Sequence, residues 1–180
     1  MSKYKLRHDL KLDLGHVVLY RIERLSNGEI GGWIEKESNL SQDGDAWVSG
    51  DAWVSGDARV YGNALVYGDA WVSGDARVYG NAQVYGDARV SGDARVYGNA
   101  RVYGDARVKK DYQIVNFIIP GMFSITVTPQ NIAIGCELKT HEDWLKITKK
   151  QAKAMGLEEY YSHYKQLVKT GIALVKTEGK

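Results

Sequence analysis

The chain has 180 residues, which is enough for one ordinary domain or for a small core with appendages. Its hydrophobic fraction of 44% and charged fraction of 26% are those of a soluble globular protein. The formal net charge is only +2, so the field of the whole molecule neither demands nor excludes an anionic partner.

The first twenty residues alternate charged side chains with short apolar runs. They lack the apolar block and the small-residue cleavage site of a signal peptide. Nowhere do eighteen apolar residues run together, so we expect no membrane span. The single cysteine, Cys136, cannot form an intramolecular disulfide and fits a reducing compartment, so we expect a cytoplasmic protein.

Residues 1–43 are expected to form an N-terminal capping segment. Within it, the stretch "GGWIEKESNL" resembles a degenerate opening turn of the repeats that follow. Gly32 and Ile34, and then Ser38 and Leu40, keep a six-residue phase before a slip of two residues.

Residues 44–109 repeat the unit Gly-Asp/Asn-Ala-x-Val-Tyr/Ser eleven times without an insertion. Ala and Val lie two residues apart, so a strand points both to the same side, and glycine permits the bend between units. Separate hairpins would leave strands of only four residues. A coil that turns the same way at each bend buries every Ala and Val, and hexapeptide periods are typical of a parallel β-helix.

A second period of eighteen residues supports this fold. Asn replaces Asp at the bends of residues 63, 81 and 99. A flat array gives no reason for such spacing, whereas residues eighteen apart stack directly above one another in a three-sided coil. We therefore predict a mainly β protein with a three-sided parallel β-helix of about four turns, in which the Asn side chains form an amide ladder.

The outward residues sort into three faces. The first carries Trp47, Leu65, Gln83 and Arg101, and the second carries Trp53, Trp71, Arg89 and Arg107. The third, called here the Arg–Tyr face, carries Arg59, Arg77 and Arg95 beside Tyr61, Tyr79 and Tyr97. The tryptophans cluster toward the N-terminal end, so residues 1–43 are expected to fold over them.

The Arg–Tyr face has two interpretations. Guanidinium groups and aromatic rings at strand spacing could grip phosphates or stack bases. Alternatively, the stacked side chains cover and stiffen a sheet while each arginine pairs with a nearby aspartate. Residues 44–109 hold six Arg and one Lys against eight Asp, and this balance argues against nucleic acid, whose grooves are plainly basic.

The candidate binding residues are therefore assigned to a protein partner or a small anionic ligand. They are Arg59, Arg77, Arg95, Tyr61, Tyr79 and Tyr97 of the Arg–Tyr face, together with Arg89 and Arg107 of the second face. The aspartate columns lack the G-G-x-G-x-D pattern of calcium β-rolls, so we predict no metal and no cofactor.

The repeat region resembles in architecture the left-handed hexapeptide β-helices, which include acyltransferases and zinc carbonic anhydrases. Those enzymes depend on histidines as general bases or metal ligands. Residues 44–109 contain no His, Cys or Glu, and the insertion loops that shape an acyl-donor site are missing. We expect the coil not to be an enzyme.

Residues 110–180 lose the period and are expected to form a separate α+β module of three strands and two helices. The strands are predicted at 111–119, 123–128 and 132–136, and the helices at 140–155, capped by Thr140, and at 157–175. Cys136 and His141 fall close together in the sequence and suggest a nucleophile or metal site, although such a pair is more often structural.

Several stretches together resemble hexapeptide-repeat proteins of tailed phages and prophages: "KYKL", "LYRIERL", "GGWIEKESNLS", "GDAWVSGDARVYGNA" and "IGCELKTHEDW". The resemblance covers nearly the whole chain. It implies a solenoid, left-handed like known hexapeptide helices, made in an infected bacterium. It brings no established activity and no catalytic residues.

The leading hypothesis is a non-enzymatic binding protein that acts against a bacterial host defence, by binding a host protein or by sequestering a nucleotide signal. We expect a homo-oligomer, with a trimer favoured. The alternative is a structural role, as a rigid trimeric spacer or a virion-associated appendage. The discriminating property is whether the protein retains a ligand or packs with copies of itself.

Overall fold

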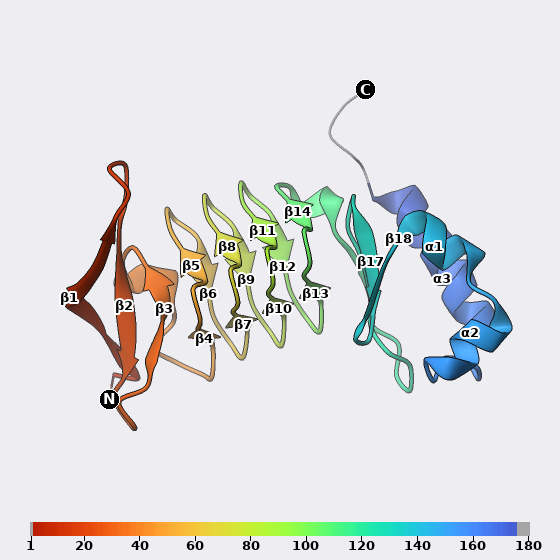
Figure 1. Ribbon diagram of the computed structural model, residues 1–180, viewed down its shortest axis with the longest axis horizontal. Coiled ribbons are helices and arrows are strands. Elements are labelled where there is room, and N and C mark those ends of the chain that lie inside the picture. The colour runs from red at the N-terminus through yellow and green to blue at the C-terminus, as the bar shows by residue number, and fades with distance from the viewer. Residues whose placement is uncertain (1, 176–180) are drawn as a thin grey trace.

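The computed structural model describes residues 2–175, and the last five residues of the predicted C-terminal module lie outside this part of the chain. The molecule is a rod with an N-terminal sheet, a central coil and a C-terminal module in chain order (Figure 1). It has two hydrophobic cores. One runs without a break from Tyr4 to Val108, and the other runs from Ile125 to Val175. The N-terminal segment is thus part of the coil's core.

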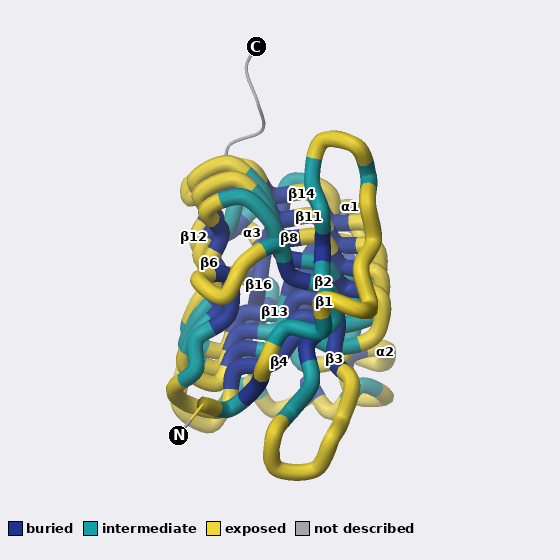
Figure 2. The backbone as a smooth tube through the Cα atoms, turned by 90° about the vertical axis from the view of Figure 1, so that its left-hand side faces the viewer, coloured by how far each residue is buried: buried dark blue, intermediate teal, exposed yellow. Residues whose placement is uncertain are grey.

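The coil is built from two-residue parallel strands joined by bends. They are β4 (Trp47–Val48), β5 (Trp53–Val54), β6 (Arg59–Val60), β7 (Leu65–Val66), β8 (Trp71–Val72), β9 (Arg77–Val78), β10 (Gln83–Val84), β11 (Arg89–Val90), β12 (Arg95–Val96), β13 (Arg101–Val102) and β14 (Arg107–Val108). They pair in the orders β4-β7-β10-β13, β6-β9-β12 and β5-β8-β11-β14. The predicted three-sided β-solenoid of about four turns is confirmed, and the view along the rod shows its three sides (Figure 2). Its left-handed sense stays a prediction.

The interior of the coil contains only the alanine and valine of each unit. From Ala46 to Val108 these side chains are at most 1% exposed. Partners in neighbouring turns are eighteen residues apart, as in the pairing of Val54 with Val72. The predicted amide ladder is confirmed as well, because the Asn63 amide donates to Asn81 and the Asn81 amide donates to Asn99, both at 3.2 Å.

The hydrogen bonds between turns run in both directions, as the parallel pairing of the strands requires. A backbone N–H of one turn donates to a carbonyl of the next, as from Trp47 to Ala64 at 3.0 Å and from Tyr61 to Val78 at 3.0 Å. Each end of the coil therefore presents backbone N–H and C=O groups that no further turn can satisfy. Both sets need partners, because a buried polar group without one costs roughly 1–3 kcal/mol.

Donor side chains cover the N-terminal end. Lys3 donates to the carbonyl of Ala46 at 2.8 Å, and the Tyr4 hydroxyl donates to the carbonyl of Leu40 at 2.8 Å. The fully buried Asn39 donates to the carbonyls of Gly56 and Ala58 at 3.0 and 2.9 Å.

Acceptor side chains cover the C-terminal end. The Thr126 hydroxyl accepts from the backbone N–H of Arg101 at 3.0 Å, and the side-chain Oε1 of Gln130 accepts from the backbone N–H of Arg107 at 3.0 Å. The Oε1 atom of Gln113 accepts from Lys109 at 2.7 Å. The same end also receives donors, because Asn116 donates to the carbonyl of Tyr97 at 3.5 Å and Ser124 donates to the carbonyl of Asn99 at 3.3 Å. At the other end Glu35 accepts from the N–H of Gly56 at 2.6 Å, so each end is closed by both donors and acceptors.

The N-terminal sheet consists of β1 (Tyr4–Asp13), β2 (Val18–Arg24) and β3 (Ile30–Ile34), of which β3 pairs in parallel with β5. After it, η1 (Glu37–Asn39) completes the opening turn. Ile34 pairs with Val54 and Leu40 bridges to Val60, so the opening turn spans twenty residues in place of eighteen. This confirms the predicted six-residue phase and the slip of two residues. The long β1–β2 hairpin was not predicted.

The tryptophans are covered unequally. Trp47 is 5% exposed and lies under the Arg24 guanidinium, 3.9 Å from its ring centre. Trp53 packs edge-on against Trp71 with ring centres 4.2 Å apart, and Trp71 remains 39% exposed. The expectation that residues 1–43 fold over the tryptophans is right for Trp47 and wrong for Trp71, because the hairpin reaches only the first turns of the coil.

The C-terminal module follows η2 (Asp111–Gln113) and differs in detail from the prediction. Up to residue 175 it has four antiparallel strands, β15 (Val115–Phe117), β16 (Ile125–Val127), β17 (Asn131–Ile134) and β18 (Glu137–Thr140), and three helices, α1 (His141–Lys146), α2 (Lys149–Ala154) and α3 (Tyr161–Leu174). Gly135, with a φ of 59°, turns the chain so that β18 folds back on β17. The predicted first helix is split because Thr148 caps a new helix by accepting from the N–H of Gln151.

We predict that Gly74→Ala destabilises the coil more than Gly156→Ala does. Both glycines have positive φ, 66° and 72°, which costs an alanine about 1–2 kcal/mol. At Gly74 an added Cβ would also lie 2.9 Å from the backbone nitrogen of Gly92, whereas at Gly156 nothing lies within 4 Å. Urea unfolding should show an extra cost of about 1–3 kcal/mol for Gly74→Ala. Equal costs would contradict the role of close stacking between turns.

We predict that Asn39→Leu costs about 3 kcal/mol or more, because it leaves the carbonyls of Gly56 and Ala58 and the N–H of Lys36 without their partner. The control is Asn99→Leu, which changes an exposed side chain at the end of the amide ladder and should cost less than about 1 kcal/mol. Equilibrium unfolding compares the two variants. A cost for Asn39→Leu no larger than the control's would refute the capping role.

Candidate functional site

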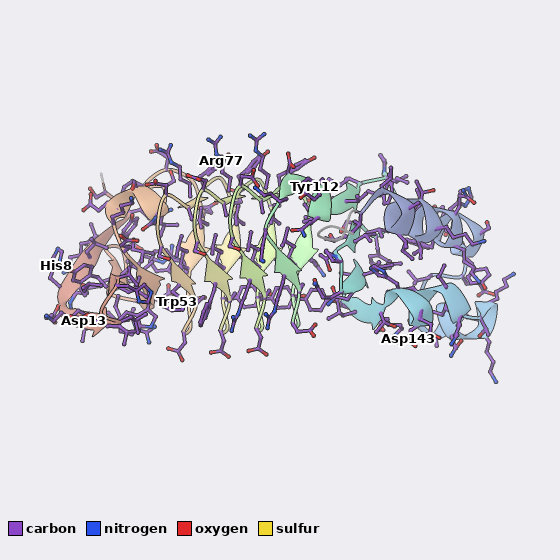
Figure 3. All side chains as sticks on the ribbon, turned by 90° about the horizontal axis from the view of Figure 1, so that it is seen from above. His8, Asp13, Trp53, Arg77, Tyr112 and Asp143 are labelled. Atoms are coloured by element: carbon purple, nitrogen blue, oxygen red, sulfur yellow. The ribbon has the colours of Figure 1, made fainter. Side chains whose placement is uncertain are left out.

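The Arg–Tyr face is formed by β6, β9 and β12 and the residues that follow them. Arg59 pairs in register with Arg77, and Arg77 with Arg95, so the parallel ladder fixes the three arginines in one column. Neighbouring members are separated by the strand spacing of ~4.8 Å. All three are exposed, and Arg77 points away from the rod (Figure 3).

None of these arginines is paired with a carboxylate in the part of the chain from residue 2 to residue 175. Asp57 pairs with Lys36 at 2.7 Å, and Asp93 pairs with Lys110 at 3.3 Å. The hydrogen bond from Lys36 lowers the pKa of the Asp57 carboxyl, so that this aspartate stays ionised and engaged. The interpretation in which the arginines of this face pair with nearby aspartates is therefore wrong, and lysines from the two capping segments pair with two of those aspartates.

The tyrosines of the face stack on one another. The Tyr61 and Tyr79 rings are 4.9 Å apart with an angle of 2° between their planes, and the Tyr79 and Tyr97 rings are 5.5 Å apart with an angle of 16°. Both faces of the middle ring are thus occupied, so a base cannot insert within the column. Only the outer faces of Tyr61 and Tyr97 remain for stacking with a ligand.

A groove of about 630 Å³ lies at the N-terminal end of this face. It is lined by Arg59, Arg77, Tyr61, Val60, Leu40 and the polar residues Glu37, Ser38, Ser41 and Gln42. Its cause is the opening turn. The backbone N–H of Ser41 donates to the carbonyl of Val60 at 2.9 Å, just as the backbone N–H of Tyr61 donates to the carbonyl of Val78. Ser41 therefore takes the position of a tyrosine in the column.

In the same opening turn, asparagine replaces the outward arginine of the repeat. Asn39 stands one turn before Arg59 and is buried as a cap of the ladder. The opening turn therefore lacks both outward side chains of the repeat, which leaves the groove. The sequence reasoning missed Ser41 and Asn39 as part of the site, although the six-residue phase of the opening turn already aligned them with Tyr61 and Arg59.

Arg89 and Arg107 lie on another side of the coil, apart from the Arg–Tyr face. The Arg89 guanidinium covers the Trp71 ring at 4.2 Å from its centre. A groove of about 240 Å³ joins Trp71, Arg89 and Arg107 with residues around Ser73 and Ser91. The structure therefore divides the predicted arginines between two separate surfaces.

A second tyrosine column, on the β7-β10-β13 side, is more sheltered. Tyr67 and Tyr85 stack at 4.7 Å, and Tyr85 and Tyr103 stack at 4.5 Å. Burial raises the pKa of all three hydroxyls. These tyrosines cover the outer face of the sheet and are partly buried, so the Arg–Tyr face is the more accessible of the two.

Cys136 and His141 do not form a site. Cys136 is exposed at the turn before β18, and His141 begins α1 after that strand, where its Nε2 atom lies 2.7 Å from the carbonyl of Thr128. The five residue steps from Cys136 to His141 along extended chain separate the two by roughly 16 Å. The suggested nucleophile or metal pair is wrong, and no group of three metal-ligating side chains occurs among the residues that the structure places.

A groove of about 530 Å³ next to β18 contains Glu137, Lys139, Asp143 and Lys146 with apolar Ile147 and Met155. Two of its lysines are already in ion pairs, Lys139 with Glu137 and Lys146 with Glu142. Because the charges here are mixed and largely compensated, this groove is a weaker candidate than the one at Tyr61.

The fold and the repeats define a β-solenoid repeat protein. A family described as "YdcK Beta solenoid repeat" matches the overlapping segments 58–74, 70–86, 82–96 and 94–109. The matched segments cover the arginine and tyrosine columns and leave out both capping segments. No curated protein matches the chain. Within residues 2–175, no helix has the length and apolar character needed to cross a membrane.

We predict that Tyr79→Leu destabilises the protein by roughly 1–3 kcal/mol, because the Tyr79 ring makes two stacking contacts worth about 0.5–1.5 kcal/mol each. Tyr97→Leu is the matched comparison and should cost about half as much, because Tyr97 stacks on one side only. Urea unfolding monitors both. If neither substitution changes stability, stacking does not stiffen this face.

Proposed function

We propose that the protein is a non-enzymatic binding protein that holds an anionic partner on its Arg–Tyr face. The observation that carries this proposal is the column of Arg59, Arg77 and Arg95, fixed by the ladder and left without carboxylate partners among residues 2–175. Each neighbouring pair of charges at ~4.8 Å repels by about 0.9 kcal/mol even in water. An anion placed between them removes this repulsion.

The chemistry of the face favours binding over catalysis. Its outward residues are arginine and tyrosine, which donate hydrogen bonds to phosphate or carboxylate groups. Hydrogen bonds to charged groups contribute about 1.5–3 kcal/mol each, so three arginines acting together give useful affinity. The coil fixes the backbone of all three, so the ordering cost of binding falls on their exposed side chains, at about 0.5–1.5 kcal/mol each.

The resemblance to phage and prophage proteins supplies the biological setting of the proposal. In this setting the partner is a host protein with an acidic surface or a small anionic ligand, and the outcome is interference with a bacterial defence. The protein then acts in the cytoplasm of the infected cell, where both kinds of partner occur.

We predict that replacing Arg59, Arg77 and Arg95 together with glutamine removes the bound partner. Tagged protein is purified gently from a bacterial host and studied by native mass spectrometry before and after denaturation. The wild-type protein should retain a defined protein or small anion, and the triple variant should lose at least 90% of it, because each lost contact weakens binding about tenfold or more.

The control removes the same charge elsewhere. Lys149, Lys150 and Lys169 are exposed on α2 and α3, and their replacement with glutamine should leave the partner bound. Retention of the same partner by the arginine variant, or loss from both triple variants alike, would show that the face does not hold it.

A structural role within a homo-oligomer is the second candidate. It is favoured by the exposed apolar residues Ile118, Ile119 and Phe123 in the loop before β16, which are 50%, 37% and 52% exposed. Both ends of the coil are capped, so copies would join side by side and not end to end. A ligand-free trimer in the same native spectra, dispersed by Ile118→Ser together with Phe123→Ser, supports this role.

A further inference from the structure

We infer that the groove beside Tyr61 is a binding site for a mononucleotide, whose planar base completes the tyrosine column and whose phosphate meets the arginine column. This inference rests on the proposed function of the Arg–Tyr face and names its ligand class. It follows because the opening turn has Ser41 in place of a tyrosine and Asn39 in place of an arginine, so both columns of the Arg–Tyr face stop at the same turn.

The base site is the outer face of the Tyr61 ring. One face of this ring stacks on Tyr79 at 4.9 Å, and the position one turn before it is held by Ser41. A serine side chain is much smaller than a tyrosine ring, so the slot has the height of one strand spacing, ~4.8 Å. An aromatic ring inserted there stacks on Tyr61 in the same way as Tyr79 does, and stacking is tolerant of base identity.

The phosphate site is formed by Arg59 and Arg77, which line the same groove and have no carboxylate partner in the described chain. Two guanidinium groups held in register present parallel N–H donors, the arrangement that suits phosphate oxygens. Asp57, which belongs to the same repeat unit as Arg59, is already paired with Lys36 at 2.7 Å. The groove thus places a cationic pair beside a free aromatic face.

The remaining lining orients the ligand. Glu37 is exposed and has no ion-pair partner among residues 2–175, so it repels phosphate and accepts hydrogen bonds from an amino group. Its side of the groove therefore suits the amino edge of a base. The volume of about 630 Å³ lies within the range of about 300–1,000 Å³ that small-ligand pockets occupy.

The other end of the column lacks these features. Tyr97 is followed by the loop of Ile118, which packs against Gly98, and Asn116 lies 3.5 Å from the carbonyl of Tyr97. Only Arg95 of the arginine column stands beside it. Tyr97 is therefore a natural control for Tyr61, since both end the same stack.

The test is isothermal titration calorimetry with adenosine 5′-monophosphate as the probe, and with adenosine and ribose 5-phosphate as the two half-ligands. Adenosine 5′-monophosphate should bind at least tenfold more tightly than either half-ligand, because each of them lacks one of the two contacts. Tyr61→Leu should weaken binding of the nucleotide by about five- to 150-fold, the range of one base–aromatic stack. Tyr97→Leu should leave it within twofold of the wild-type value.

Ser41→Tyr provides a second variant that removes no binding group. It fills the slot with the ring that the repeat itself would supply, and it should abolish nucleotide binding while the thermal unfolding temperature stays unchanged or rises. Unchanged binding by Ser41→Tyr would overturn the slot even if Tyr61→Leu proved unstable.

The results separate this inference from the proposed function. Ribose 5-phosphate binding as tightly as the nucleotide, or no nucleotide binding at millimolar concentration, would overturn the base slot. In either case a partner that is lost only from the Arg59, Arg77 and Arg95 triple variant would still support anion binding by the face. Retention of that partner by the triple variant would instead overturn the proposed function itself.

Discussion

The hydrogen-bonded pairing of each turn with the next is the constraint on which the rest of this structure depends. An inner turn finds its partners in its neighbours, as Tyr79 does in Val96, whereas the outer edges of the first and last turns need partners from other segments. Lys3, Tyr4 and Asn39 supply donors at one end, and Thr126, Gln130 and Gln113 supply acceptors at the other. The thin core of Ala and Val cannot hold the coil alone, and each end must be closed by a segment that supplies these partners.

The sequence correctly predicted the features that repeat with every unit or every turn of the coil. The inward Ala and Val, the stacking of residues eighteen apart and the ladder through Asn81 all follow from a repeated local geometry, and the structure confirms them. The β1–β2 hairpin and the break at Thr148 depend on contacts between unlike segments, which no period records. The Cys136 and His141 pair failed for a related reason, since closeness in sequence along a strand means separation in space.

The candidate site lies between these two cases. The columns of the Arg–Tyr face could be placed from the repeat alone, whereas the groove could not. It exists because the opening turn must bury Asn39 to satisfy the carbonyls of Gly56 and Ala58, so the position of an outward arginine is given up to capping. Ser41 then stands where a tyrosine would continue the stack. The proposed ligand site is thus a consequence of how the coil begins.

The capping segments contact only the outermost turns of the coil, and each inner turn meets only copies of itself. The number of turns is therefore free to change by whole units of eighteen residues while both ends stay intact. Because the successive units are almost identical in sequence, insertion or deletion of one unit preserves the kind of contact between turns. Each such change alters the count of arginines and of tyrosines on the Arg–Tyr face by one, so the length of the rod and the length of its binding surface change together.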